Sequence, residues 1–570
     1  MHCALLIKSI PMASYSLDSH NQLLDEKSAA HLLRRATFGS DIETTKAFAG
    51  LSATDAFANL TLQREIPKPP VDPKTSAPWT NPPLQNKAGN ENSENDKLFN
   101  FFVAWHLDNM RTDGAHLRER MTWFLHSHIP VSIDVVNSNE AIYYQNALYR
   151  KYALGNLKLL FKKICIDNAM LRYLDGHTNS RDEPNENFAR EMFELYSIGK
   201  GPQIAEGNYT NFTEDDIKAA TRVLTGYILD KNFENIDQET GIPTGVLKTA
   251  FNGGVEIATR HDAGEKIFSA AFGGKVIKPL ETSAGFATKE AAMQELDELI
   301  EMIFEQKETA RFICRKLYRF YVYHEINPDV ERDIIEPLAD IFYNNNYEFI
   351  PVLSKLLTSK HFFDADNAET ADNNIGALIK SPIEIIMGSL RFFNVAFPDK
   401  ETQLMQFYED AYSNIIFKEI RQQGMNLYEP FEVAGYPAYH QLPGFNRNWI
   451  TATNLAYRYQ FSDILMNRRG NDNPGILLNI LEWVENSGHI ENPGDPAEIV
   501  TVLTRYLYPI EIVQERSDYF LHTLFLEGLA PATWTSEWNA YKNSDDNTVV
   551  KLKLEVLLSA IIQTPEYQLF

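Results

Sequence analysis

Cysteine is scarce in this chain, with only Cys3, Cys165 and Cys314 among 570 residues. Three thiols this far apart cannot build a disulfide framework, and none has the CxxC spacing of a zinc site. The apolar surroundings of Cys165 and Cys314 indicate buried, unreactive thiols instead. The sequence therefore excludes disulfide-rich and zinc-ribbon classes of protein.

Long hydrophobic runs are missing as well. No stretch approaches the roughly 18 apolar residues of a membrane-spanning helix, so no transmembrane segment is predicted. Near the start of the chain, Lys8 and Pro11 interrupt a mildly apolar run. That run is shorter than the core of a signal peptide, so no export signal is predicted and the compartment stays open.

Positive charge is in deficit, because 53 Lys and Arg stand against 77 Asp and Glu, for a net charge of −24. Nucleic-acid binding would need a strong local basic patch, and the short basic cluster at 311–319 instead has helical spacing among apolar residues. Nucleic acid is therefore not an expected partner. GxSxG, HExxH, GxGxxG and P-loop motifs are also absent, which removes several familiar enzyme classes.

The composition that remains, 44% hydrophobic and 12% aromatic, is typical of a folded chain large enough for more than one domain. The apolar periodicity predicts a mainly α fold, with a large multi-helix body, long irregular loops and a small β-containing insert near 227–276. Residues 1–24 are expected to be poorly ordered. A main helical domain at 25–363 contains a Pro- and Asn-rich loop at 66–97, and a C-terminal helical region at 375–570 packs on it.

A polar loop between two predicted helices is the first candidate site. Asp175, Asn179 and Glu186 occupy positions 1, 5 and 12 of a twelve-residue window, as in a calcium-binding helix–loop–helix. His177 and Ser180 stand at positions 3 and 6, where that motif requires Asp or Asn and Gly. The calcium motif is therefore disfavoured, but a non-standard metal site with oxygen ligands stays open.

The helix that follows this loop places Glu186 and Arg190 four residues apart, with Glu191 beside them. Such spacing is typical of a surface helix stabilised by ion pairs. The alternative is a binding role, because the Asn and Glu residues of the first turn are poor helix formers unless they cap or bind something.

Two histidines, His126 and His128, precede a proline that ends a predicted helix. They could act as metal ligands or as an acid–base pair. The alternative is one histidine at the helix end, interacting with the helix dipole, and one packed histidine.

Another candidate is the segment from Arg260 to Lys266. His261 and Asp262 supply a base beside a carboxylate, and Lys266 adds a charge that could bind an anion. A solvated turn explains the same residues.

In their order along the chain, several segments resemble one large bacterial family, catalogued as domain of unknown function 1800. These segments are His31–Gly39, Arg120–His128, Asn185–Glu191, Tyr209–Tyr227, His261–Lys266, Lys380–Arg391 and Gly435–Trp449. The resemblance covers about 29–570. The chain departs from the family pattern at Leu125, Ser127 and Ile129, where Trp, Asn and Phe are expected, and it keeps both histidines.

The resemblance implies a mainly helical protein of a family whose members are often exported or envelope-associated and commonly encoded beside a sulfatase-like family. A sulfatase-like partner is thus an expectation from the resemblance. It assigns no reaction and no catalytic residue.

Two hypotheses follow from the residues. The first is a hydrolase-like enzyme with one composite polar pocket for an anionic substrate; no cofactor is identified, but a divalent metal would fit the donors. Its residues would be His126, His128, Glu191, His261 and Asp262 for catalysis, Arg190 and Lys266 for the substrate, and Asp175, Asn179 and Glu186 for a metal. The second is a non-catalytic binding or assembly protein, in which the polar groups form a closed hydrogen-bond network. An open pocket with unpaired polar groups would favour the enzyme.

Overall fold

The computed structural model describes residues 15–80, 97–367, 373–468, 470, 475–544 and 546–570. The predicted mainly α fold is confirmed, because 54% of the chain is helical and the strands form only two-stranded sheets. Most of the predicted poorly ordered N-terminus (1–14) and half of the predicted 66–97 loop (81–96) lie outside the described residues. In the described part of the chain, no helix has the length and apolar character needed to cross a membrane.

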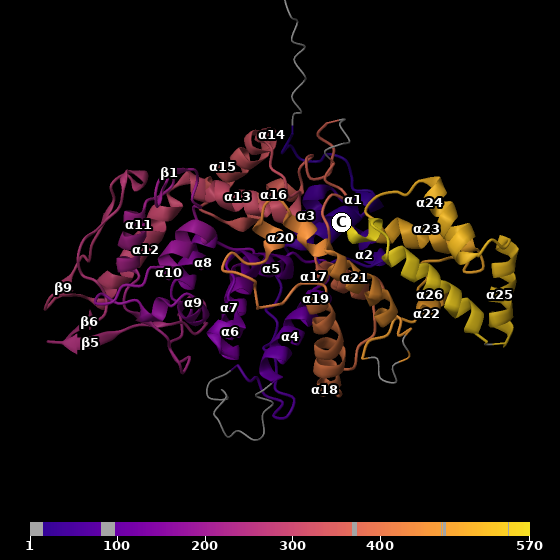
Figure 1. The fold of residues 1–570 in the computed structure, drawn as a ribbon, viewed down its shortest axis with the longest axis horizontal. Helices are drawn as coiled ribbons and strands as arrows, with labels where there is room; N and C mark the ends of the chain where they lie inside the picture. Colours follow the sequence, from indigo (N-terminus) through magenta and orange to yellow (C-terminus); the bar gives the residue numbers. More distant parts are fainter. Residues whose placement is uncertain (1–14, 81–96, 368–372, 469, 471–474, 545) are drawn as a thin grey trace, which may run out of the picture.

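The molecule is elongated, with β-hairpins at one end and the last helices at the other (Figure 1). Its centre is built from the first helices of the chain, with α5 among them. These are α1 (Glu26–Ala36), α2 (Ile42–Phe48), α3 (Ala53–Leu60), α4 (Leu98–Thr112), α5 (Arg118–His128), α6 (Ile133–Val136) and α7 (Asn139–Tyr152).

The hairpin end contains short helices, α12 and five antiparallel strand pairs, which extend beyond the insert predicted at 227–276. The helices are α8 (Leu157–Ile164), α9 (Asn168–Tyr173), η2 (Gly176–Thr178), α10 (Asn187–Glu191), η3 (Met192–Tyr196), α11 (Glu214–Val223), η4 (Ala270–Phe272) and α12 (Lys289–Phe304). The strand pairs are β1 (Gln203–Ala205) with β2 (Asn208–Tyr209), β3 (Tyr227–Ile228) with β4 (Val246–Leu247), β5 (Thr249–Asn252) with β6 (Val255–Ala258), β7 (Lys266–Ile267) with β8 (Val276–Ile277), and β9 (Thr282–Ser283) with β10 (Phe286–Ala287).

A helical layer above the centre consists of α13 (Lys307–Tyr321), α14 (Pro328–Val330), η5 (Glu331–Ile335), α15 (Glu336–Asn344) and α16 (Phe349–Leu357). The rest of the chain begins in the centre, builds the opposite lobe and returns beside α1 at its last residues (Figure 1). It forms α17 (Pro382–Phe392), α18 (Leu404–Gln406), η6 (Phe407–Phe417), α19 (Lys418–Gln422), α20 (Pro437–His440), η7 (Phe445–Ile450), α21 (Ala452–Leu465), α22 (Ile480–Asn486), α23 (Pro496–Leu507), α24 (Gln514–Asp518), η8 (Tyr519–Phe525), α25 (Pro531–Ser544), α26 (Thr548–Ile562) and η9 (Glu566–Gln568).

Local sequence signals explain where several helices begin. Thr213 and Asp216 form a capping box at the start of α11, and Ser381 with Glu384 forms another at α17. A single cluster of contacting buried side chains runs from Leu17 to Tyr567, so one continuous core joins the predicted N- and C-terminal regions.

Helix α5 carries several polar side chains into the core. All eleven of its residues are buried, although Arg118, Glu119, Arg120 and its histidines are polar. A buried polar group is costly unless it is hydrogen-bonded or paired. The partners of the α5 side chains, and the nitrogens without partners, therefore indicate where a functional site can lie.

Candidate functional site

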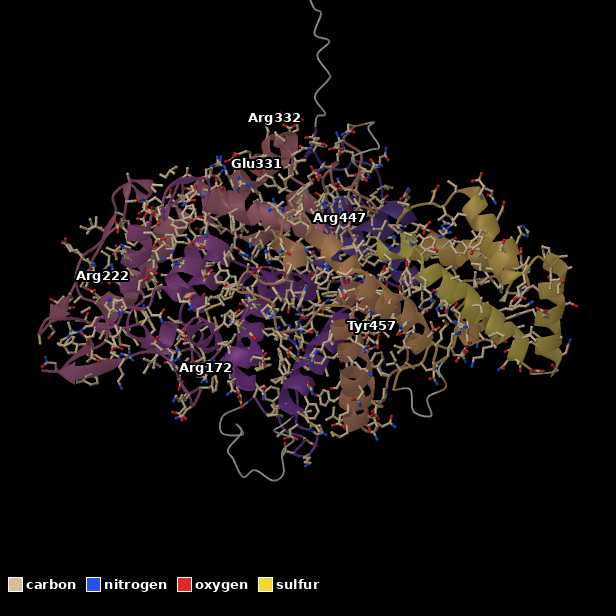
Figure 2. All side chains as sticks on the ribbon, viewed as in Figure 1. Arg172, Arg222, Glu331, Arg332, Arg447 and Tyr457 are labelled. Atoms are coloured by element: carbon tan, nitrogen blue, oxygen red, sulfur yellow. The ribbon has the colours of Figure 1, made fainter. Side chains whose placement is uncertain are left out.

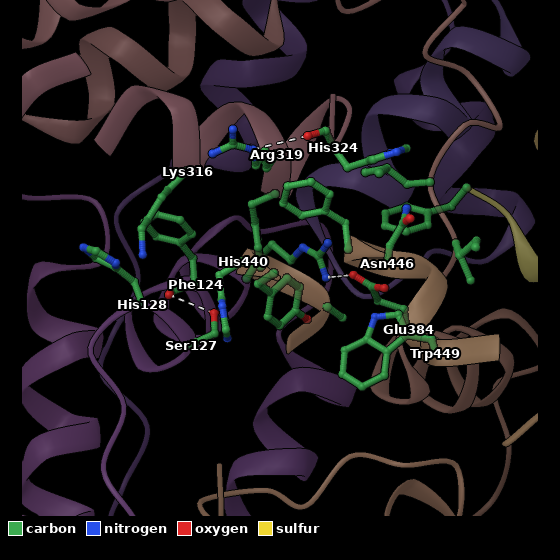
Figure 3. A pocket seen from close by; sticks show the side chains of 18 of the residues that line it. Phe124, Ser127, His128, Lys316, Arg319, His324, Glu384, His440, Asn446 and Trp449 are labelled. Carbon is green, nitrogen blue, oxygen red and sulfur yellow. Dashed lines mark hydrogen bonds and ion pairs between the residues drawn. The ribbon is translucent and has the colours of Figure 1, made fainter. Parts of the chain in front are cut away.

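A pocket opens where the C-terminal part of α5 meets α13, the start of α17 and the segment at 434–449. Its empty volume is about 650 Å³ with the open mouth included. Figure 3 shows Phe124, His128 and Lys316 along one side and Glu384, Asn446 and Trp449 along the other, with His440 between them. It is lined by Arg120, Phe124, Ser127, His128, Lys316, Arg319, Phe320, His324, Leu378, Ile379, Glu384, Ala434, Ala438, Tyr439, His440, Phe445, Asn446, Trp449 and Phe570.

The charge of this lining is opposite to that of the whole chain. Arg120, Lys316 and Arg319 face one carboxylate, Glu384, in a protein whose net charge is −24. Arg120 uses that carboxylate in a buried ion pair, while Arg319 donates from Nε to the main-chain oxygen of His324 at 3.2 Å. The pocket thus carries an excess of positive charge, which favours an anionic ligand.

Lys316 is the lining residue best suited to proton transfer. Within the described residues it has no ion-pair or hydrogen-bond partner, and its ammonium lies 5.0 Å from the centre of the Phe312 ring. Burial, together with the charge of Arg319, lowers the pKa of Lys316 to about 7. A lysine with such a pKa can accept and return a proton near neutral pH.

Two histidines lie within the electrostatic reach of this lysine. Burial, and then the charge of Lys316, lower the pKa of His128, whose Nε2 lies 2.9 Å from the main-chain oxygen of Tyr196. Burial also lowers the pKa of His440, against the effect of Glu432 and with a smaller contribution from Lys316. His128 Nδ1 is buried without a hydrogen-bond partner among the described residues.

Unpaired nitrogens continue along the lining. His324 Nδ1 and Asn446 Nδ2 are also buried and have no partner in the described part of the chain. Unsatisfied buried groups are uncommon in proteins and each calls for an explanation, such as a ligand. The pocket therefore combines excess positive charge, unpaired polar nitrogens and a lysine that titrates near neutrality.

His126 does not line this pocket, although it is only two residues from His128. Residues two apart point to different faces of a helix, and His126 packs against the rings of Tyr428 and Trp123, with centroids 4.2 and 5.3 Å away. It is fully buried, neither ring nitrogen has a partner among the described residues, and burial lowers its pKa to about 3. His126 is therefore a neutral core histidine here.

His261 and Lys266 form a separate buried network with a residue that the sequence did not single out, Glu295. One oxygen of the Glu295 carboxylate accepts from His261 Nε2 at 2.8 Å and also binds Lys266 Nζ, while the other has no partner among the described residues. All three side chains are almost fully buried. Asp262 instead binds Arg222 at 2.7 and 3.1 Å. His261, Lys266 and Asp262 thus each have a charged partner, which fits a structural role.

Figure 2 shows that this network is remote from the pocket along the molecule. Arg222, the partner of Asp262, lies at the hairpin end, and Arg447, whose charge contributes to lowering the pKa of His324, lies near the centre. The solvated turn considered for this segment is not what the structure has, because His261 and Lys266 are unexposed.

The predicted oxygen ligands do not converge either. Asp175 is exposed, whereas Asn179 is buried and donates to the main-chain oxygen of Thr221 at 2.8 Å. Glu186 is exposed and pairs with Arg190 at 2.8 Å. Across the described ranges, no group of three or more His, Cys, Asp or Glu side chains is arranged to hold a metal ion.

Arg190 and Glu191 lie at the end of α10. Arg190 binds both carboxylate oxygens of Glu214, at 2.7 and 2.8 Å, as well as Glu186. Glu191 is half-buried, and burial with the nearby charge of Glu194 raises its pKa. The residues of the composite pocket expected from the sequence are thus in several separate places, and only His128 of them lines the open pocket.

The sequence did contain a signal for the residues that were missed. Lys316 and Arg319 belong to the basic cluster at 311–319, which was read as one face of a helix, and α13 is indeed that helix. His440 lies inside the 435–449 segment that carries part of the family resemblance. No sequence pattern indicated that these two segments meet at α5.

Comparison with known proteins identifies the family without identifying a reaction. A family model described as "Protein of unknown function (DUF1800)" matches residues 31–569, nearly the whole chain. Searches of curated proteins and of solved structures give no match.

Proposed function

The chain belongs to the family described as protein of unknown function (DUF1800), and because that description carries no reaction, we propose a function from the pocket at α5. We propose a hydrolase-like enzyme that binds a small anionic substrate in this pocket. Lys316 is the proton-transferring group, and His128 and His440 assist it. The observation that carries the proposal is Lys316 itself, a pocket lysine with no acidic partner in the described residues and a pKa of about 7.

The pKa of Lys316 suits this role. A general acid or base works best when its pKa lies near the working pH, because both protonation states are then populated. Such a group typically contributes ~10²–10⁴-fold to a rate. His128 and His440 stay mostly neutral near pH 7, because burial lowers both pKa values, so their rings can accept or relay the proton of Lys316.

The cations supply substrate binding. Arg319 keeps guanidinium donors beyond the Nε that binds His324, and the amide nitrogen of Asn446 is unpaired in the described residues. A carboxylate, phosphate or sulfate group of a substrate would give these donors an acceptor. Phe124, Phe320 and Trp449 provide apolar walls for the remainder of a small molecule.

Part of the sequence hypothesis changes in this proposal. His128 keeps its acid–base role, while His261, Asp262, Lys266 and Arg190 become structural residues, because each already has partners. Asp175, Asn179 and Glu186 do not converge in the structure, so this proposal gives them no role as metal ligands.

The rival function, a non-catalytic binding protein, also has one observation in its favour. Leu442, within the 434–449 segment that lines the pocket, is 75% exposed, and Phe431, three residues before that segment, is 85% exposed. Large exposed apolar side chains next to a pocket fit contact with a partner. In that case the pocket would bind an anion without converting it.

The first experiment tests the lysine without a known substrate. Purified protein is labelled with a trace of acetic anhydride between pH 5 and 10, and each lysine is followed by mass spectrometry. Half-maximal reactivity of Lys316 is expected near pH 7. Lys418, which is exposed on α19, serves as the control. A normal titration of Lys316 would contradict the proposal.

The second experiment tests the reaction. Aryl phosphates, sulfates and carboxylate esters are screened for release of the phenol, with wild type, Lys316→Met, His128→Gln and Lys418→Met. Turnover with an inflection near pH 7, reduced ~10²-fold or more in Lys316→Met and unchanged in Lys418→Met, is expected. Anion binding without turnover of any ester would favour the binding protein.

A further inference from the structure

A second pocket lies on the other side of Glu384, between α1, α17 and the end of α23. Its empty volume is about 530 Å³ with the mouth included. Glu384 and Phe570 line both pockets, so these two residues form the wall between them. Among the described residues, Glu384 is also the only one with a side-chain carboxylate that lines either pocket.

The second pocket has cations of its own, Arg34 and Lys380. Arg34 donates to the main-chain oxygen of Tyr506 at 2.6 Å, and Lys380 Nζ donates to that of Tyr567 at 2.7 Å. Neither has an ion-pair partner in the part of the chain that is described. Lys380 is only 8% exposed, and a buried ammonium group without a counter-ion is costly.

Glu384 cannot neutralise both cations, because its oxygens are already engaged. One binds Arg120 across the wall, and the other accepts from the main-chain nitrogen of Ser381 in the capping box of α17. Two further guanidinium groups, those of Arg35 and Arg458, are fully buried nearby and bind main-chain and amide oxygens. The charge of Glu384 acts on both of these groups and on Lys380.

The floor of this pocket is built for close approach. Gly39 has φ +97°, and a Cβ there would stand 2.9 Å from the Cα of Gly388. Both glycines line the pocket, so the turn that follows α1 meets α17 backbone to backbone. Arg34 belongs to α1, and Lys380 lies two residues before the first residue of α17.

We infer that the pocket lined by Arg34 and Lys380 is a second anion-binding site, which takes a small oxyanion such as phosphate, sulfate or a carboxylate. The anion supplies the missing counter-charge to Arg34 and Lys380. This inference does not depend on catalysis in the first pocket. Burial, with the charge of Arg34, lowers the pKa of Lys380 well below its usual value, so an arriving anion also brings a proton onto this lysine.

Equilibrium dialysis of the purified full chain with radiolabelled phosphate, sulfate and acetate at low ionic strength tests the inference. Wild type is expected to bind two ions of the preferred kind. Arg34→Gln and Lys380→Met should each weaken binding at the second pocket about tenfold or more, whereas Arg34→Lys should keep it. Lys316→Met should weaken binding only at the first pocket. Circular dichroism verifies that each variant is folded. If Lys380→Met does not fold, the test relies on Arg34→Gln, because Arg34 is only half-buried.

A second readout separates binding at this site from a general charge effect. Sulfate added at pH 8 should cause proton uptake in wild type that is lost in Lys380→Met or reduced in Arg34→Gln. Binding of a single ion, lost in Lys316→Met and unchanged in Arg34→Gln, would overturn the second site and leave the proposed function standing. Binding of no ion would overturn both.

Discussion

Arg120 and Glu384 form an ion pair inside the wall between the two pockets, with their side chains 1% and 8% exposed. Arg120 also lies over the Phe320 ring, 4.4 Å from its centre. The pair joins α5 to the start of α17, and it separates two groups of cations whose linings contain no other Asp or Glu side chain among the described residues.

The first prediction concerns the loss of this carboxylate. Glu384→Gln keeps a residue suited to the capping box but leaves Arg120 as an uncompensated buried charge. Removing one partner of a buried pair costs about 3–5 kcal/mol, so urea unfolding should show a loss of about 3 kcal/mol. The exposed Glu401→Gln is the control and should change stability by less than about 0.5 kcal/mol.

The same variant should respond to anions. Without the charge of Glu384, both pockets become more positive, and added sulfate should stabilise Glu384→Gln more than wild type. Equal stabilisation of the two proteins over a sulfate series would show that Glu384 does not compete with anions for these cations.

The second prediction is a pH dependence of stability that comes from Lys316. Because its folded pKa is lowered from 10.5 to about 7, the unfolded chain binds more protons between these values, and wild-type stability rises with pH across this window. Lys316→Met removes the cost of burying the charge, which is fully present below pH 7. After allowance for partial exposure, the variant should gain about 1–2 kcal/mol at pH 6, and the gain should disappear near pH 10. A gain independent of pH would indicate improved packing instead.

The fold was largely predictable from the sequence because its signals are local. Helical periodicity and caps such as Thr213 with Asp216 act within one or two turns, and they gave the mainly α class and the start of α11. The β-insert was predicted from Gly pairs and alternation, and its hairpins extend to Ala287 because two-residue strands leave almost no pattern.

The site was less predictable because burial is not local. In the sequence, Arg118–His128 has too many polar residues for a core helix, yet all of α5 is buried. The sequence singled out His126 and His128 together, but only the packing of the 434–449 segment decides that His128 faces a pocket and His126 a core. Glu295 carried no motif, although it holds both His261 and Lys266. The sulfatase-like partner and the export implied by the family resemblance stay predictions.

The third prediction tests whether His126 is a core residue. His126→Leu replaces a fully buried ring with no hydrogen-bond partner in the described residues by an apolar side chain of similar size. At pH 7 we expect a stability within about 1 kcal/mol of wild type and full anion binding, because no hydrogen bond is lost. A large loss of anion binding in a folded variant would show a functional role.

Acid should separate this variant from wild type further. The pKa of His126 is lowered from 6.5 to about 3 in the fold, so the unfolded chain takes up a proton first, and wild type loses stability as pH falls below 6.5. The leucine variant lacks this loss, and it should be relatively more stable by about 2 kcal/mol at pH 5. Parallel stability curves for the two proteins between pH 7 and 5 would contradict the lowered pKa.

The last prediction compares two glutamates of the polar segments. Glu295→Gln takes the charge from a carboxylate that holds His261 and Lys266 in the core, and leaving Lys266 without a counter-charge should cost about 3 kcal/mol. Glu186→Gln removes only a surface partner of Arg190, which keeps Glu214, so it should cost less than about 0.5 kcal/mol. Because both sites are apart from the pocket at α5, folded samples of both variants should bind phosphate as wild type does. If Glu295→Gln instead kept its stability and lost phosphate binding, the His261 network would be a ligand site after all, and the composite pocket expected from the sequence would regain its support.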